Sequence, residues 1–114
     1  MTTEELHKEI LRLTDFWYRY VGMDHHKDRD CHWTIEETWS YGAKPKYVVR
    51  HDGYIFEGGE RKCDTYENAL RELRDMLKEA IKEERKTATN ILYASDEYDE
   101  IQVKQAQFVL SESL

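Results

Sequence analysis

The chain has 114 residues, of which 39% are hydrophobic and 36% are charged, and its formal net charge is −7. Such a chain is long enough for one hydrophobic core, so residues 1–114 are expected to form a single domain with a strongly solvated surface. The acidic balance argues against electrostatically driven binding to nucleic acid or anionic membranes, because both depend on Lys and Arg neutralising phosphate.

The lengths of the apolar runs and the polarity of the N-terminus predict the cellular compartment of the protein. No apolar run approaches the roughly 18 residues of a membrane span. The N-terminal stretch Met-Thr-Thr-Glu-Glu is acidic and polar, unlike a secretory signal peptide. We therefore expect a cytoplasmic protein whose two cysteines, Cys31 and Cys63, are free thiols.

The first expected element is an amphipathic helix over residues 1–22. Thr2 and Glu5 have the spacing of a capping box, and Gly22 is placed to end the helix. Its apolar residues repeat at helical spacing, the pattern of a core-facing stripe: Leu6, Ile10, Leu13, Trp17 and Tyr20. The polar stretch 23–30 is expected to be a loop.

Residues 31–60 are expected to form three antiparallel strands, a β-meander. The first, 31–41, alternates in polarity, which is typical of a sheet that is covered on one face. Asp52-Gly53 lies between two β-prone runs, 47–50 and 54–57, and predicts a two-residue hairpin turn, because both turn positions need positive φ. Gly58-Gly59 is expected to be the end of the third strand or a bulge.

The turns predict a register for this sheet. The expected pairs are Tyr41 with Tyr47, Trp39 with Val49, Glu37 with His51, His51 with Tyr54, and Val49 with Phe56. Aromatic and β-branched residues then share the core face, where such cross-strand pairs stabilise a sheet. A slip of one residue would move every side chain to the opposite face.

A long amphipathic helix is expected over residues 64–93. Asp64 has the place of an N-cap, with Glu67 in the first turn. Its apolar face consists of Tyr66, Leu70, Leu73, Leu77, Ala80 and Ile81. Two ends fit this pattern: residue 86, with a break at 87–90, or about residue 93.

The C-terminal segment, 95–114, fits a strand or a helix, and a helix is favoured because acidic residues cluster where its first turn would lie. The predicted fold class is therefore α+β with two layers: an N-terminal helix, a three-stranded antiparallel β-meander, a long amphipathic helix and a C-terminal segment. The helices are expected to pack on the aromatic face of the sheet.

Histidine and cysteine side chains suggest one alternative function, a metal-binding or small hydrolytic protein. The candidates have the ligand chemistry of zinc: His25, His26, Cys31, His32, His51 and Cys63. Their spacing matches no zinc motif, and neighbouring residues of a strand point to opposite faces. Neither a metal nor a cofactor is predicted.

A carboxylate–imidazole pair, Glu37 with His51, is a second chemical candidate, either as general acid and base or as a structural ion pair. The chain offers no nucleophile motif and no phosphate loop beside it, so no catalytic residue is predicted. Aromatic residues of the sheet resemble a base-stacking platform, yet they are expected to be core.

The acidic residues of the second half carry the leading hypothesis. Residues after Cys63 have a net charge of −5, against −2 before. The predicted partner-binding residues are Glu83, Glu84, Asp96, Glu97, Tyr98, Asp99 and Glu100. They suggest a non-enzymatic module, of the type encoded by phages or mobile elements, that inhibits or modulates a larger host protein. A nucleic-acid-processing enzyme with a basic channel would fit such a surface.

A structural homodimer is the remaining alternative. Its interface would be the outer face of the sheet, which is expected to carry Thr34, Glu36, Thr38, Val48, Arg50 and Ile55. Val48 and Ile55 would form the exposed apolar pair of that face.

Overall fold

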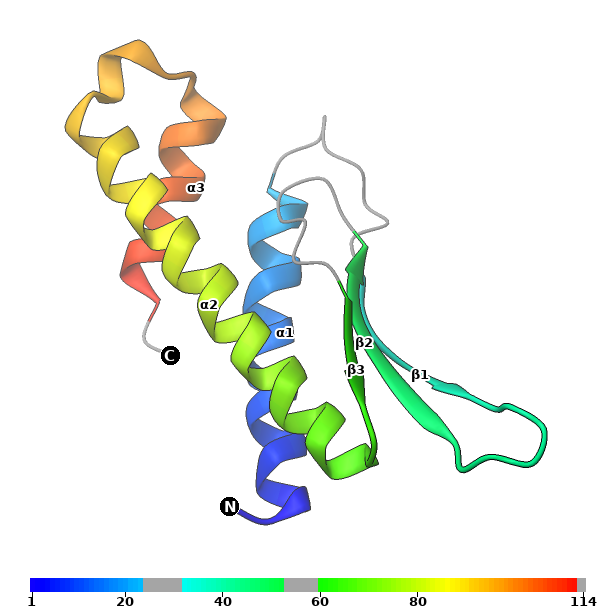
Figure 1. Cartoon of the computed structure of the whole chain (residues 1–114). Helices are drawn as coiled ribbons and strands as arrows, with labels where there is room; N and C mark the ends of the chain where they lie inside the picture. Colours follow the sequence, from blue (N-terminus) through cyan, green and yellow to red (C-terminus); the bar gives the residue numbers. More distant parts are fainter. Residues whose placement is uncertain (24–31, 53–59, 113–114) are drawn as a thin grey trace.

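A computed structural model describes residues 1–23, 32–52 and 60–112 of the chain. The elements follow in the order α1 (Thr3–Gly22), β1 (His32–Thr38), β2 (Lys46–Asp52), β3 (Glu60–Cys63), α2 (Tyr66–Tyr93), the 3₁₀ turn η1 (Ser95–Glu97) and α3 (Glu100–Ser111) (Figure 1). This order confirms the α+β prediction. Within the described ranges, no helix is both long and apolar enough to cross a membrane.

Helix α1 begins where its capping residue predicts. The side-chain oxygen of Thr2 accepts a hydrogen bond from the backbone N–H of Glu5 at 3.2 Å, which satisfies one of the free donors of the first turn. The buried residues of α1 include the predicted stripe and add two: Leu6, Ile10, Leu13, Phe16, Trp17, Tyr20 and Val21. The sequence therefore located this helix and its inner face correctly.

The three strands form one antiparallel sheet in the order β1-β2-β3. In β1 and β2, Glu37 pairs with Tyr47, Ile35 with Val49 and Trp33 with His51. The predicted register was wrong by four residues, because β1 ends at Thr38 and the connection to β2 is longer than the loop that we expected. A shift of an even number keeps each side chain on its predicted face.

The third strand was also misplaced. Val49 pairs with Arg61, so β3 is Glu60–Cys63 and the predicted pair of Val49 with Phe56 was wrong. The predicted pair of His51 with Tyr54 involves a residue outside the described ranges. The turn at Asp52-Gly53, the run 54–57 and Gly58-Gly59 lie wholly or partly outside the described residues. Tertiary contacts set the position of β3, since this strand buries Cys63 in the core and pairs Glu60 with Arg50 at 2.8 Å.

Helix α2 ends at Tyr93, the later of its two predicted ends. Its N-cap is Thr65, whose hydroxyl oxygen accepts a hydrogen bond from the N–H of Asn68 at 3.1 Å. The prediction of Asp64 as the cap was therefore wrong by one residue; Asp64 instead pairs with Lys46. No break occurs at 87–90, where Thr87 and Thr89 donate their hydroxyls to carbonyls one turn back within the helix.

The C-terminal segment is helical, as favoured from the sequence. Asp99 and Gln102 form a capping box at the start of α3: the Asp99 carboxylate accepts the N–H of Gln102 at 2.8 Å, and the Gln102 side chain accepts the N–H of Asp99 at 3.1 Å. Helix α3 packs along α2 and contacts α1. In Figure 1 it lies on the side of the helices away from the sheet.

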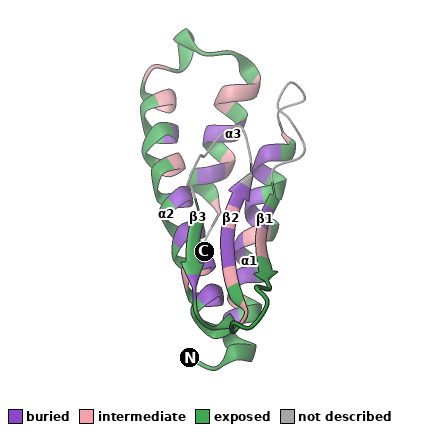
Figure 2. Ribbon diagram, turned by 45° about the vertical axis from the view of Figure 1, so that its right-hand side comes forward, coloured by how far each residue is buried: buried purple, intermediate pink, exposed green. Residues whose placement is uncertain are grey.

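The core forms where α1 meets the sheet and the other two helices. Trp17 has no exposed surface, and its ring lies 5.5 Å from the Trp33 ring on β1 and 5.6 Å from the His51 ring on β2. Phe16 stacks on Phe108 of α3 at 5.3 Å. Figure 2 shows buried residues concentrated on the inner faces, whereas the closed end of the β1–β2 hairpin and the α2–α3 connection are exposed.

Candidate functional site

The closed end of the β1–β2 hairpin is the most exposed aromatic surface among the described residues. Trp39 is 73% exposed and Tyr41 is fully exposed. Both lie in the connection between β1 and β2, which curves away from α1 and α2 and ends free of the helices (Figure 1). We call Trp39 and Tyr41 the aromatic tip.

A tight turn displays these side chains. The N–H of Ala43 donates to the carbonyl of Ser40 at 3.0 Å, and Gly42 has a φ of +80°. This combination is that of a type II turn, which needs glycine at its third position because a Cβ disfavours positive φ. Tyr41 therefore occupies the second position of the turn and points outward from its end.

The base of the hairpin is held in place by side-chain contacts. Thr38 donates its hydroxyl to the carbonyl of Lys46 at 3.2 Å, and Tyr47 donates to the carboxylate of Glu37 at 3.2 Å. Desolvation and that carboxylate raise the pKa of Tyr47 from its ordinary value of 10.0, which favours the protonated hydroxyl that donates. The tip is thus displayed on a fixed base, which lowers the entropic cost of binding.

The expectation that Trp39 and Tyr41 belong to the core was wrong. The alternation that predicted it holds as far as Ile35, but β1 ends at Thr38 and no helix covers the residues beyond it. The sequence contained a signal for this exposure, since a glycine, a proline and two lysines follow Tyr41 within five residues. Such a composition is typical of a loop.

The predicted acidic site divides into two places. The α2–α3 connection brings together Asp96, Glu97, Tyr98, Asp99 and Glu100, all of them exposed. Glu83 and Glu84 instead lie within α2, roughly 15 Å before its end at a rise of about 1.5 Å per residue. The chain fold therefore gathers the five residues of the connection but not the two of α2.

Several of these carboxylates already have partners. Glu84 is half-buried and accepts the hydroxyl of Tyr20 at 2.6 Å. Glu83 pairs with Lys86 at 3.4 Å. Asp99 caps α3, as described above. These contacts leave fewer free acidic groups on α2 than the sequence suggested.

At the start of α3, Glu100 pairs with Lys104 at 2.9 Å, and this hydrogen bond lowers the pKa of Glu100. Asp96 and Glu97 have no ion pair within the part of the chain that the structure describes. They are the acidic groups most available to a partner.

The histidine and cysteine candidates do not converge in the described ranges. His25, His26 and Cys31 lie outside them. His32 is exposed, whereas His51 is buried with its ring 4.2 Å from that of Trp33. No group of three His, Cys, Asp or Glu side chains among the described residues is arranged to hold a metal ion.

Cys63 lies away from both histidines of the sheet. It pairs with Tyr47, four residues along β2 from His51 and hence roughly 13 Å away. Burial raises the pKa of its thiol, which opposes formation of the thiolate that binds metals or attacks substrates.

The proposed carboxylate–imidazole pair is also absent. Glu37 faces Tyr47, while His51 faces Trp33. The pairing was wrong because it depended on the misplaced register. The ring of His51 lies against the aromatic rings of Trp17 on α1 and Trp33 on β1.

The outer face of the sheet differs from the predicted dimer interface. Val48 is only 7% exposed, so the prediction of an exposed apolar residue there was wrong, and Ile55 lies outside the described residues. Val48 is on the central strand between Glu36 and Lys62, whose side chains flank it. Next to it, Arg50 bridges Glu36 and Glu60 at 3.5 and 2.8 Å, which makes this face polar.

Comparison of the chain with protein-family models, curated proteins and solved structures gives no match.

Proposed function

We propose that the protein is a non-enzymatic binding module that engages a larger protein partner through the aromatic tip. The observation that carries this proposal is the exposure of Trp39 and Tyr41 together on a turn with a fixed base. Trp and Tyr are the side chains most enriched among the residues that dominate binding energy at protein interfaces.

The binding free energy that two aromatic anchors can contribute supports a role for the aromatic tip in partner binding. Truncation of an aromatic side chain that anchors a protein interface costs about 2 kcal/mol or more of binding free energy. Two such anchors would offset a large part of the entropic cost of association. The hairpin base adds to this, since it orders the tip before a partner arrives.

The acidic α2–α3 connection supports a finer proposal. In this form the partner is a nucleic-acid-processing enzyme of a host cell, the protein acts in the cytoplasm as a phage or mobile-element type of inhibitor, and Asp96 and Glu97 meet the basic channel. The supporting features are the exposure of the acidic groups and their gathering in one connection. Complementary charge would mainly raise the association rate.

The aromatic tip is tested with Trp39→Ala and Tyr41→Ala combined. Tyr93→Ala is the matched control, because Tyr93 is 95% exposed but lies on α2. Each variant is immobilised and the capture of proteins from a lysate is quantified against the unaltered chain. We expect a partner that is lost by more than 30-fold in the double variant and kept in the control. Equal capture by the double variant would overturn the proposal.

A direct binding measurement separates protein from nucleic-acid partners. Single-stranded DNA also stacks on exposed Trp and Tyr. We expect no saturable binding of a labelled oligonucleotide, because the net charge of −7 opposes it. Tight oligonucleotide binding that depends on Trp39 would replace the protein partner with a nucleic acid.

The acidic connection is tested by neutralising it without loss of the helix cap. The test variant combines Asp96→Asn, Glu97→Gln, Asp99→Asn and Glu100→Gln, and Asn at residue 99 keeps an N-cap side chain. The control removes four charges elsewhere: Glu4→Gln, Glu5→Gln, Asp75→Asn and Glu79→Gln. We expect the test variant alone to weaken binding and to flatten its salt dependence. If the salt dependence is the same in both variants, the charge of the connection plays no role.

A further inference from the structure

A groove between α1 and α2 is lined by basic side chains. It has a volume of about 500 Å³, and five of its lining residues are basic: Arg12, Lys78, Lys82, Arg85 and Lys86. Leu13, Ile81 and Thr89 also line it, and no acidic residue is among the described residues of the lining. A local concentration of positive charge is unexpected in a chain with a net charge of −7.

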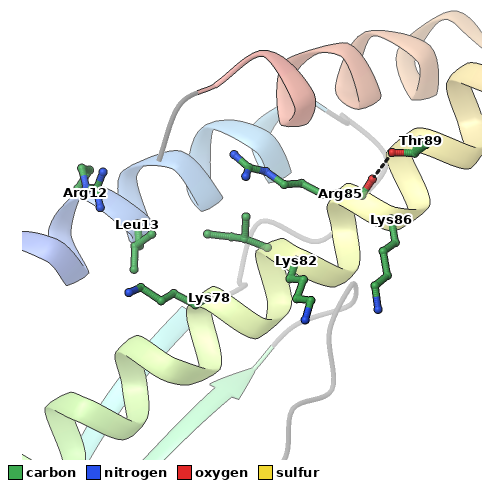
Figure 3. A pocket seen from close by; sticks show the side chains of 8 residues that line it. Arg12, Leu13, Lys78, Lys82, Arg85, Lys86 and Thr89 are labelled. Atoms are coloured by element: carbon green, nitrogen blue, oxygen red, sulfur yellow. Dashed lines mark hydrogen bonds between the residues drawn. The ribbon is translucent and has the colours of Figure 1, made fainter.

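The spacing of the sequence along α2 produces this concentration. Lys78, Lys82, Arg85 and Thr89 follow one another at three- and four-residue intervals, which places them on one face of the helix. Arg12 comes from α1 on the other side of the groove. In Figure 3 the side chain of Arg85 extends from α2 toward α1, and Lys78 lies beside Leu13.

The positive charge of the groove is only partly compensated. Lys78 pairs with Glu9 at 2.7 Å and Lys86 with Glu83 at 3.4 Å, whereas Arg85 donates to the neutral carbonyl of Glu112 at 2.8 Å.

Arg12 and Lys82 have no ion pair with any residue that the structure describes. Three of the five cations thus have no carboxylate within ion-pair distance in the described ranges, although Arg12 also interacts electrostatically with Glu9. This excess of positive charge leaves the groove attractive to anions.

Arg85 provides a second, independent indication of a ligand. Its Nε atom is buried and has no hydrogen-bond partner among the described residues. Buried donors without an acceptor are rare in folded proteins, and an unmet donor on a guanidinium is especially costly. A phosphate oxygen in the groove would accept this hydrogen bond, because guanidinium groups bind phosphate in a paired geometry.

We propose that this groove binds a small ligand that carries a di- or triphosphate group. A volume of about 500 Å³ matches small-molecule sites, and a cluster of separated cations suits adjacent phosphates better than a single carboxylate. Leu13 and Ile81 are nearly fully buried and supply an apolar floor. The groove belongs to α1 and α2, so this proposal is independent of the aromatic tip.

The proposal is tested by calorimetric titration of the chain of residues 1–114 with inorganic tripolyphosphate and with ATP at low salt. We expect saturable binding with a Kd below about 1 mM. Combined Arg12→Gln and Lys82→Gln should weaken it at least tenfold. Both residues are exposed and lack ion pairs in the described part, so the fold should persist. If the double variant does not fold, Lys82→Gln alone should still weaken binding severalfold.

A matched control distinguishes binding in the groove from nonspecific attraction of the anion to surface lysines. Lys44→Gln with Lys62→Gln removes the same charge from exposed positions outside the groove and should change the Kd less than twofold. Tighter binding of ATP than of tripolyphosphate would assign contacts to the nucleoside, and equal binding would assign them to phosphate alone. No binding at millimolar ligand, an equal loss in the control, or tighter binding of single-stranded DNA than of ATP would each overturn the proposal.

Discussion

Two tryptophans of the same hairpin, Trp33 and Trp39, have opposite environments. Both fall on one side of the alternating pattern, yet Trp33 is 8% exposed and Trp39 is 73% exposed. The ring of Trp33 lies 5.5 Å from the ring of Trp17 on α1 and 4.2 Å from the ring of His51, its cross-strand neighbour on β2. Trp39 lies past the end of β1, where no helix covers the hairpin. Alternation therefore predicts the face of a residue, whereas the reach of the helices decides its burial.

The same comparison separates the functions of the two regions. Trp33 contributes its apolar surface to folding, because that surface is already removed from water. Trp39 retains its surface for contact with another molecule. Substitutions near Trp33 should thus lower the free energy of unfolding, and those at the tip should affect binding alone.

The largest expected effect is at Trp17. Trp17→Ala removes the ring on which the buried half of the hairpin rests, and it should lower the free energy of unfolding by about 3–5 kcal/mol. Urea denaturation followed by circular dichroism measures this loss. A change below about 1 kcal/mol, within the range of an exposed position, would show that Trp17 is not central to the core.

A smaller effect is expected at the hydrogen bond between α1 and α2. Tyr20→Phe removes the hydroxyl that donates to Glu84 at 2.6 Å. Hydrogen bonds to charged groups contribute about 1.5–3 kcal/mol, and the partial exposure of Glu84 favours the lower end. The same denaturation assay should report about 1.5 kcal/mol. An unchanged midpoint would mean that water replaces the hydroxyl without cost.

A pH-dependent effect is expected at Glu9. The hydrogen bond from Lys78 lowers the pKa of Glu9 from its ordinary value of 4.5. The native state then binds fewer protons than the unfolded state, so the stabilisation is present above about pH 4.5 and is lost as the pH falls through the lowered pKa.

Glu9→Gln should therefore cost about 0.5–1 kcal/mol at pH 7, a typical value for an ion pair of this kind, and less at pH 3. Glu4→Gln is the control, since Glu4 pairs with Lys8 at a highly exposed position. A loss that is equal at pH 7 and pH 3 would exclude the ion pair as its cause.

The smallest effect on stability is expected at the tip. Trp39→Ala removes a side chain that is 73% exposed, and it should change the free energy of unfolding by no more than about 0.5 kcal/mol. A loss comparable to that of a core residue would contradict the division between the two regions and would place Trp39 in a folding role.

The sequence predicted the elements of the fold better than their pairing. Periodicity located α1 and α2 because each buries a continuous stripe, and Thr2 marked the start of α1 through its capping hydrogen bond. The register of the sheet depends on where β1 ends and on which segment pairs with β2. Those choices are set by contacts such as Cys63 with the core, which no local pattern encodes.

The candidate site was less predictable than the fold. The aromatic tip was assigned to the core because alternation continues past Thr38 into the loop. The basic groove was missed because Arg12 and Lys82 are 70 residues apart in the sequence, and only the packing of α1 on α2 brings them to one groove. By contrast, the acidic connection is contiguous in sequence, so its gathering was foreseeable.

The most direct test of the central claim is site-specific photo-crosslinking from the aromatic tip. A photoreactive phenylalanine derivative is placed at Tyr41 in one sample and at Tyr93, an equally exposed tyrosine on α2, in another. We expect a covalent adduct with one larger protein from position 41 and none from position 93. A partner that crosslinks from position 93 but not from position 41 would contradict it.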